Sequence, residues 1–212
     1  MHGLRGFALA AGSLGLVALS TLPARAAETE LAGTTEVAGG YSYIYASSSV
    51  SGVSGVSVPA GWFFTAGANI SDAFAVVTDL SGQYESNSVS GGGVTVSSSD
   101  SIHTFLAGPR VQGQSGRISF YGQFLVGAAR MSAALSVSGG SVQQASSASD
   151  TEFCFAPGAG LDFSLGEHAA LRAGVNEQFI RSITGSTPTV PPPPTFQKQF
   201  QLQIGLVYRF GN

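Results

Sequence analysis

The strongest constraint on the fold is a period of two along residues 199–210. Apolar side chains occupy every second position, and all but one of the positions between them are polar or glycine. One face holds Phe200, Leu202, Ile204, Leu206, Tyr208 and Phe210, and the other holds Gln199, Gln201, Gln203, Gly205 and Arg209. Such alternation places all the apolar residues on one side of a β-strand. The end of the chain is therefore predicted to be a strand with one apolar and one polar face.

The N-terminus has the three parts of a secretory signal peptide. Arg5 supplies a positive charge, residues 7–22 are apolar and small, and residues 24–26 (Ala-Arg-Ala) form a small-x-small cleavage site. The apolar part is too short and too interrupted by Gly and Ser to span a bilayer as a helix. We predict a cleaved signal peptide at 1–26 and one mature domain at 27–212. The alternative is a buried N-terminal helix.

The composition favours a membrane barrel. Charged residues make up only 10% of the chain, against roughly 25% in ordinary soluble domains. Beyond the leader, no apolar run is long enough for a transmembrane helix. In lipid, only helices and closed barrels satisfy every backbone polar group. Acidic residues outnumber basic ones, which argues against nucleic acid as a partner. Cys154 is the only cysteine, so no intrachain disulfide can form.

Eight segments alternate in this way, and their connections alternate between long and short. The segments lie at 33–46, 60–70, 74–86, 102–112, 117–130, 152–164, 169–181 and 198–210. The short connections are 71–73, 113–116 and 165–168, and the long ones are 47–59, 87–101, 131–151 and 182–197. Outer-membrane barrels have short periplasmic turns and longer extracellular loops. We therefore predict an all-β, eight-stranded antiparallel up-and-down transmembrane β-barrel whose four long segments are extracellular loops.

Lipid contact assigns the apolar face of each segment outward and the polar face inward. This assignment sorts the aromatic residues into two belts, the usual anchors at the two membrane interfaces. The loop-side belt holds Trp62, Phe64, Tyr84, Phe105, Phe153, Phe155, Phe179 and Phe200, and the turn-side belt holds Phe74, Phe120, Phe163, Tyr208 and Phe210.

Three residues fit this assignment poorly. Glu177 has outward parity, so either a bulge turns it inward or its strand leaves the lipid early. Pro109 and Pro157 also have outward parity, and each requires a bulge or a weakened pair. The proline-rich stretch 187–195 is expected to be extended, as a stiff exposed loop or, alternatively, a recognition stalk.

The inward faces carry charges of both signs. They are Glu36, Asp79, Glu85, Glu152, Asp162, Arg110, Arg117, Arg172 and Arg209. Since an eight-stranded lumen is only wide enough for side chains, these charges must pair. We predict an Arg–carboxylate network that plugs the turn-side half of the lumen, with spare hydrogen bonds taken up by Gln123, Asn176, Gln201 and Gln203.

Catalytic patterns are weak. His103 is followed by Thr104 and Phe105, so the His-x-Ser pair of membrane-barrel deacylases is absent, and His103 is interpreted as a solvated histidine at a loop edge. His168 lies in a short turn, and Cys154 is interpreted as a small inward or rim residue, with a reactive thiol as the alternative. Residues 91–93 (Gly-Gly-Gly) indicate a flexible loop rather than a phosphate cradle. No catalytic, cofactor-binding or metal-binding residue is predicted.

The closing Gly205, Tyr208 and Phe210 resemble the C-terminal signal read by the barrel assembly machinery of bacterial outer membranes, although Gly211 and Asn212 follow the phenylalanine. Further matches lie in residues 106–110, 158–162 and 171–179. Together they resemble the small eight-stranded, OmpA/OmpX-like "porin family" barrels of Gram-negative bacteria. The resemblance implies residence in the outer membrane, contact with its lipid and lipopolysaccharide, assembly through that machinery, and a monomeric state.

The leading hypothesis for function is a non-enzymatic structural or surface-interaction protein that acts through its loops, where binding residues of rigid scaffolds concentrate. The surface ligand is unspecified, and no cofactor is expected. A narrow channel for small solutes is the alternative, followed by a lipid-modifying enzyme. The alternative fold is a soluble lipocalin-like barrel, which would turn its apolar residues inward.

Overall fold

The computed structural model describes residues 31–46, 56–58, 60–139, 142–182 and 195–211, and within them nine β-strands. The strands are β1 (Thr35–Ala46), β2 (Val56–Val58), β3 (Ala60–Ser71), β4 (Phe74–Gly91), β5 (Val94–Ser115), β6 (Ile118–Gly139), β7 (Val142–Ser164), β8 (Ala169–Ser182) and β9 (Thr195–Phe210). No helix that could cross a bilayer lies within these ranges. The predicted signal peptide lies outside them, as do 47–55, 59 and 183–194.

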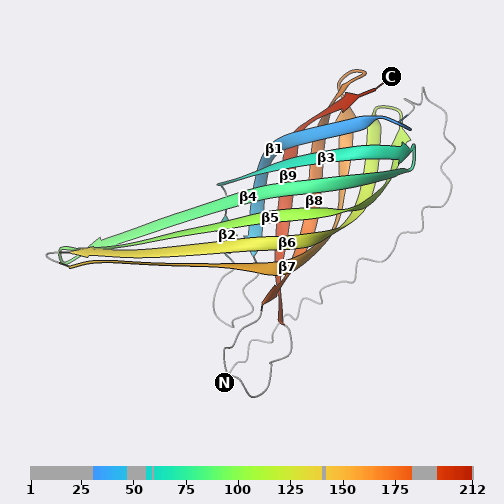
Figure 1. The fold of residues 1–212 in the computed structure, drawn as a ribbon. Helices are drawn as coiled ribbons and strands as arrows, with labels where there is room; N and C mark the ends of the chain where they lie inside the picture. The colour runs from blue at the N-terminus through green and yellow to red at the C-terminus, as the bar shows by residue number, and fades with distance from the viewer. Residues whose placement is uncertain (1–30, 47–55, 59, 140–141, 183–194, 212) are drawn as a thin grey trace, which may run out of the picture.

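The strands form one closed antiparallel ring (Figure 1). Each of β4 to β8 pairs with its neighbours in sequence, and β1 closes the ring by pairing with both β3 and β9. The short β2 pairs with the end of β1 beyond β3, so it adds no ninth place to the ring. The first and last barrel strands meet at the same end, where Thr35 pairs with Phe210. The predicted eight-stranded up-and-down barrel is confirmed.

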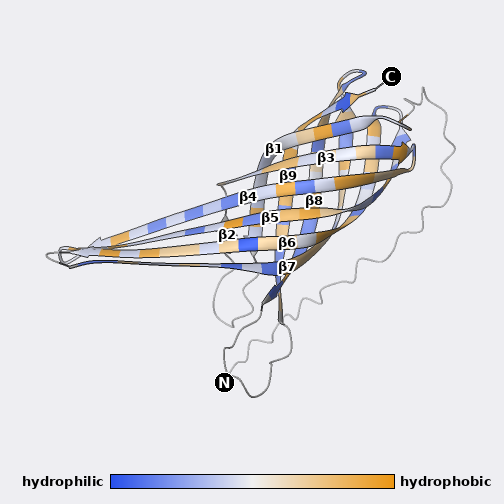
Figure 2. Ribbon diagram, viewed as in Figure 1, coloured by the Kyte–Doolittle hydropathy of each residue, from blue (hydrophilic) through white to orange (hydrophobic). Residues whose placement is uncertain are grey.

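The period of two places the side chains as predicted. In β3, Trp62 and Phe64 are each 42% exposed on the outer face. Phe63 and Thr65, at the alternate positions, are buried in the lumen. Hydrophobic and hydrophilic residues alternate along the barrel strands in Figure 2. The large apolar residues of the closing strand from Phe200 to Phe210 are likewise exposed, as lipid-facing residues should be.

Two of the predicted loops are wrong. The segments 87–101 and 131–151 are mostly strand, because β4–β5 and β6–β7 continue as two long hairpins that pair with each other along β5 and β6. This four-stranded sheet, hereafter the extension, projects beyond the rest of the barrel (Figure 1). Its first hairpin turns at Gly92 (φ 61°) and Gly93 (φ 80°). Two consecutive positive φ angles define the type I′ turn of a tight hairpin, so the predicted flexible glycine loop is wrong too.

The poorly fitting residues keep their outward parity. The ladder between β5 and β6 is interrupted at Pro109, and the ladder between β7 and β8 is interrupted at Pro157. The pairing resumes in the same register after each gap, so these are weakened pairs rather than bulges. Glu177 pairs with Phe200 in a regular ladder and stays on the outer face, half-buried. A bulge therefore does not turn Glu177 inward.

Candidate functional site: the lumen and the extension

Arg172 is the centre of an ion-pair network in the turn-side half of the lumen. Its guanidinium donates to both carboxylate oxygens of Asp162 at 2.8 Å and to Glu36 at 2.8 Å. It also donates to the hydroxyl of Thr65 at 3.2 Å. Arg209 donates to Asp162 at 3.0 Å, and its Nε lies 3.7 Å from Glu36. These ions belong to four different strands, so the network forms only when the barrel closes.

Arg110 extends the network across the lumen. It pairs with Glu36 and donates to Gln123 Oε1 at 2.9 and 3.1 Å. Gln123 in turn donates to Asn176 at 2.9 Å, and Asn176 donates to Gln201 at 3.3 Å. Buried charges are stable only when they are paired and hydrogen-bonded. The amides supply the hydrogen bonds that Arg110 does not form with Glu36.

The predicted plug is therefore confirmed, but fewer of the predicted charged residues belong to it. Asp79 lies deep in the lumen without an ion pair, whereas Glu85 and Glu152 lie higher and are half-buried. Arg117 is exposed in a turn. The sequence interpretation missed Tyr121, whose ring lies 4.3 Å from the Arg110 guanidinium and 5.0 Å from that of Arg172. Its inward parity, shared with Gln123, was the available signal.

The lumen also contains an apolar cluster, which corrects the expectation that inward faces are polar. The cluster comprises Ala75, Val77, Leu106, Leu125, Ala129, Cys154, Ala156 and Ile180. Such a narrow lumen is filled by side chains, and apolar ones fill it without requiring hydrogen-bond partners. Cys154 is fully buried in this cluster, so its interpretation as a small inward residue is confirmed.

His103 faces outward beside Tyr84. Its Nε2 lies 3.0 Å from the Tyr84 hydroxyl, which is also 3.4 Å from the indole nitrogen of Trp62. A tyrosine and an indole at an interface anchor a strand, and neither is the serine of a His-x-Ser pair. Within the described ranges, no three His, Cys, Asp or Glu side chains gather as metal ligands.

The outer face of β6–β9 carries a cluster of phenylalanines. Phe155 stacks on Phe179 at 4.7 Å and also contacts the rings of Phe124, Phe153 and Phe196. The Lys198 ammonium lies 5.2 Å from the centre of the Phe179 ring. Phe153, Phe155 and Phe179 belong to the predicted loop-side belt, and Phe124 and Phe196 are additions to it.

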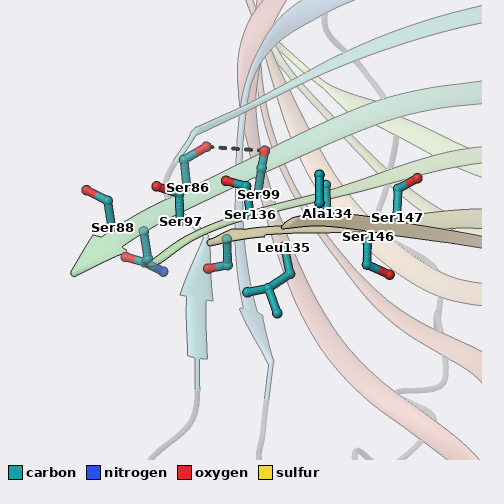
Figure 3. Close-up of a pocket in the computed structure, with 12 residues that line it drawn as sticks. Ser86, Ser88, Ser97, Ser99, Ala134, Leu135, Ser136, Ser146 and Ser147 are labelled. Atoms are coloured by element: carbon teal, nitrogen blue, oxygen red, sulfur yellow. Dashed lines mark hydrogen bonds between the residues drawn. The ribbon is translucent and has the colours of Figure 1, made fainter. Parts of the chain in front are cut away.

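The extension has two different faces. One face, hereafter the serine face, carries almost only hydroxyl and methyl side chains: Ser86, Ser88, Ser90, Thr95, Ser97, Ser99, Ser101, Ser132, Ala134, Ser136, Ser138, Gln143, Ala145, Ser147 and Ser149. Ser86, Ser99 and Ser147 point to the same side in Figure 3, whereas Leu135 and Ser146 point to the other. Two adjacent grooves, of about 450 and 360 Å³, are lined mainly by serine-face residues.

The plugged lumen predicts a result for ion conduction. We expect the folded protein to show no steady single-channel current in a planar bilayer, because the network fills the turn-side half of an already narrow lumen. A heat-modifiability gel on the same sample would show that the barrel is folded. Reproducible openings of constant size would contradict this prediction and would make the lumen a conduction path.

A closed eight-stranded barrel with lipid-facing apolar residues, aromatic belts and a polar lumen defines an integral membrane β-barrel. Residues 14–210 match the family model described as outer membrane protein beta-barrel domain. The chain belongs to this family, and it resides in the lipid bilayer of an outer membrane. No curated protein sequence matches it.

Solved structures of Ail show the same fold at low sequence identity. Ail, the attachment invasion locus protein of Yersinia pestis, is 18% identical, with a TM-score of 0.55 over 84% of this chain and 99% of Ail. Ail in complex with the heparin analogue sucrose octasulfate gives a TM-score of 0.56 at the same identity and coverage. Neisserial surface protein A is 15% identical, with a TM-score of 0.47 over 84% of this chain and 96% of that protein.

Proposed function

We propose that this protein is a non-enzymatic surface-interaction protein whose binding surface is the serine face of the extension. The observation that supports this function most is that the two longest hairpins are one ordered sheet with grooves on one face. A rigid sheet presents its side chains at defined spacings, as a binding surface requires, and binding residues on rigid scaffolds are favoured.

The chemistry of the serine face indicates an uncharged, hydrogen-bonding partner. Each hydroxyl can donate and accept, and none of the residues that make up the face is ionised. The larger groove crosses all four strands, from β4 to β7, a distance of about 15 Å at the usual strand spacing. A groove of this length suits an extended hydroxylated chain such as a neutral glycan better than a compact ligand.

Trimming the extension tests this function. Deleting residues 87–90 with 95–98, and 135–138 with 143–146, removes whole rungs in blocks of four, so the strand phase and both hairpin turns are retained. We expect the trimmed protein to fold as a heat-modifiable barrel and to lose binding. The measurement is binding of both proteins, in nanodiscs, to arrays that carry neutral polysaccharides such as dextran beside sulfated ones such as heparin.

The array also separates the alternatives. The polyanion-binding alternative predicts retention on heparin, the parent of the analogue bound by Ail, and this would contradict a neutral partner. Most of the lining of the larger groove lies in the deleted rungs, so equal binding of the full and trimmed proteins would contradict this groove as the binding site. A variant with Asp150→Asn, on the opposite face of β7, is the control and should bind as the parent does.

We also propose that the outer face contacts the phosphates of lipopolysaccharide. Arg130, Arg181 and Lys198 are exposed, have outward parity and lie beside or just beyond the phenylalanine cluster of the loop-side belt. None of the three forms an ion pair with a described residue. Cations next to an aromatic belt are well placed for anionic headgroups at the membrane surface.

The route to the membrane is part of the same proposal. A signal peptide at 1–26 would direct export of the domain at 27–212. The barrel assembly machinery would then recognise Gly205, Tyr208 and Phe210 at the end of β9, which pairs with β1 at the closing seam. The protein is proposed to act as a monomer. Catalysis is not part of this proposed function, in which the hydroxyl of Tyr84 and the ring of His103 anchor the strands at the interface.

A further inference from the structure

Asp79 is a buried carboxylate that stands outside the direct ion pairs of the plug, and the charges of Arg110 and Arg172 act on it only at longer range. It lies on β4 with 0% of its surface exposed, and it forms no ion pair with another described residue. Gln203 donates to its Oδ2 at 3.1 Å, whereas its Oδ1 has no hydrogen-bond partner among the described residues. The arginines of the plug are hydrogen-bonded to Glu36 and Asp162 instead.

Amide oxygens accompany this carboxylate. The Oε1 atoms of Gln83, Gln178 and Gln199 are buried and have no hydrogen-bond partner among the described residues. Gln83 and Gln178 use their amide nitrogens elsewhere, to Ser42 at 2.5 Å and to Gln201 at 3.0 Å respectively. Gln203 joins them to Asp79, because it also donates to Gln201 at 3.3 Å. The loop-side half of the lumen therefore contains several unpaired oxygen acceptors, and hydrogen bonds through Ser42, Gln201 and Gln203 link Gln83 and Gln178 to Asp79.

We propose that this half of the lumen binds a monovalent alkali cation, with Asp79 as its anionic ligand. Carboxylate and amide oxygens are the ligands that hard cations take in proteins, and carbonyl-type oxygens replace the hydration shell of alkali ions in channels. A single carboxylate matches a single positive charge. A buried carboxylate is costly unless it is paired, and a bound cation supplies that pair.

The loop-side rim of the lumen is acidic, as the entrance to a cation site should be. Glu85, Asp100, Asp150 and Glu152 continue the inward rows of β4, β5 and β7 toward the extension, and Glu85 is paired directly with Asp100. Like charges opposite each other destabilise a strand pair unless a cation lies nearby. The basic residues of the same region, Arg130, Arg181 and Lys198, are on the outer face. The acidic rim thus concentrates cations at the entrance to the site.

Thermal unfolding in different salts tests this site without reference to the surface ligand. The refolded protein is heated in NaCl, KCl and choline chloride at equal ionic strength, and the folded fraction is read from circular dichroism and a heat-modifiability gel. We expect Na⁺ or K⁺ to raise the midpoint by several degrees over choline, which is too large to enter. Equal midpoints in all three salts would overturn the proposal.

Asp79→Asn keeps the shape of the side chain and removes the charge. We expect this variant to lose the difference between the alkali salts and choline, and Glu167→Gln, in an exposed turn, to retain it. A difference that persists in Asp79→Asn would overturn the assignment. If Asp79→Asn does not fold, ²³Na NMR of the parent protein decides the question. Line broadening that K⁺ competes away is expected, and its absence would overturn the site.

Discussion

Replacing Arg172 with leucine is expected to lower the free energy of unfolding by about 3–5 kcal/mol, the usual cost of removing one partner from a buried ion pair. Arg172 is 1% exposed and forms hydrogen bonds to Asp162, Glu36 and Thr65. Leucine would leave Asp162 with Arg209 and Glu36 with Arg110, so two carboxylates would share two arginines in place of three. Oδ1 of Asp162, whose hydrogen bond comes from Arg172, would stay buried without a donor, and this unsatisfied buried charge causes the destabilisation.

Urea unfolding of the protein in lipid vesicles measures this effect. Trp62 is the only tryptophan and lies on the lipid-facing surface, so its fluorescence reports insertion and unfolding. Arg117→Leu is the matched control, because Arg117 is exposed in a turn and should change stability by less than about 0.5 kcal/mol. If the two variants unfolded at the same urea concentration, the network would not contribute to stability.

Gly40→Ala is expected to interfere with closure of the barrel. Gly40 on β1 pairs with Gly205 on β9 at the seam where the ring closes. A Cβ atom at Gly40 would lie 2.9 Å from the carbonyl carbon of Ile204 and still closer to its oxygen and to the Cα of Gly205. These are backbone atoms, which cannot move aside without opening the seam. We therefore expect at least the ~1–3 kcal/mol typical of overpacking, and a large loss of folded protein.

The yield of the heat-modifiable band after refolding measures this loss. Gly122→Ala is the control, because a Cβ there would lie 3.7 Å from a Val111 methyl group, an ordinary contact. Gly40 is also outside the C-terminal signal, so its effect is separate from recognition by the assembly machinery. Normal refolding of Gly40→Ala would show that the seam does not require close approach of the two strands.

The extension shows where sequence patterns stop being informative. A strand between lipid and a filled lumen has two chemically different faces, so its sequence alternates. Along residues 86–101 and 131–151, both faces of the sheet are largely exposed, and serine is found on each. Selection for burial is absent there, so the period of two is weak and the segment resembles a loop. The two hairpins stabilise each other by pairing along β5 and β6, and a pattern within one strand cannot predict such a contact.

The sequence by itself determined the architecture, the outward faces, the aromatic belts and the membership of most of the polar plug. It could do so because each of these follows from parity along a single strand. Only the tertiary structure decided which ions pair, since Glu36 and Arg172 are 136 residues apart in the chain and meet only across the closed ring. It also decided that Asp79 is left without an arginine, and that apolar side chains fill part of the lumen. Those outcomes depend on height and distance inside the barrel, which are set by strand register and closure.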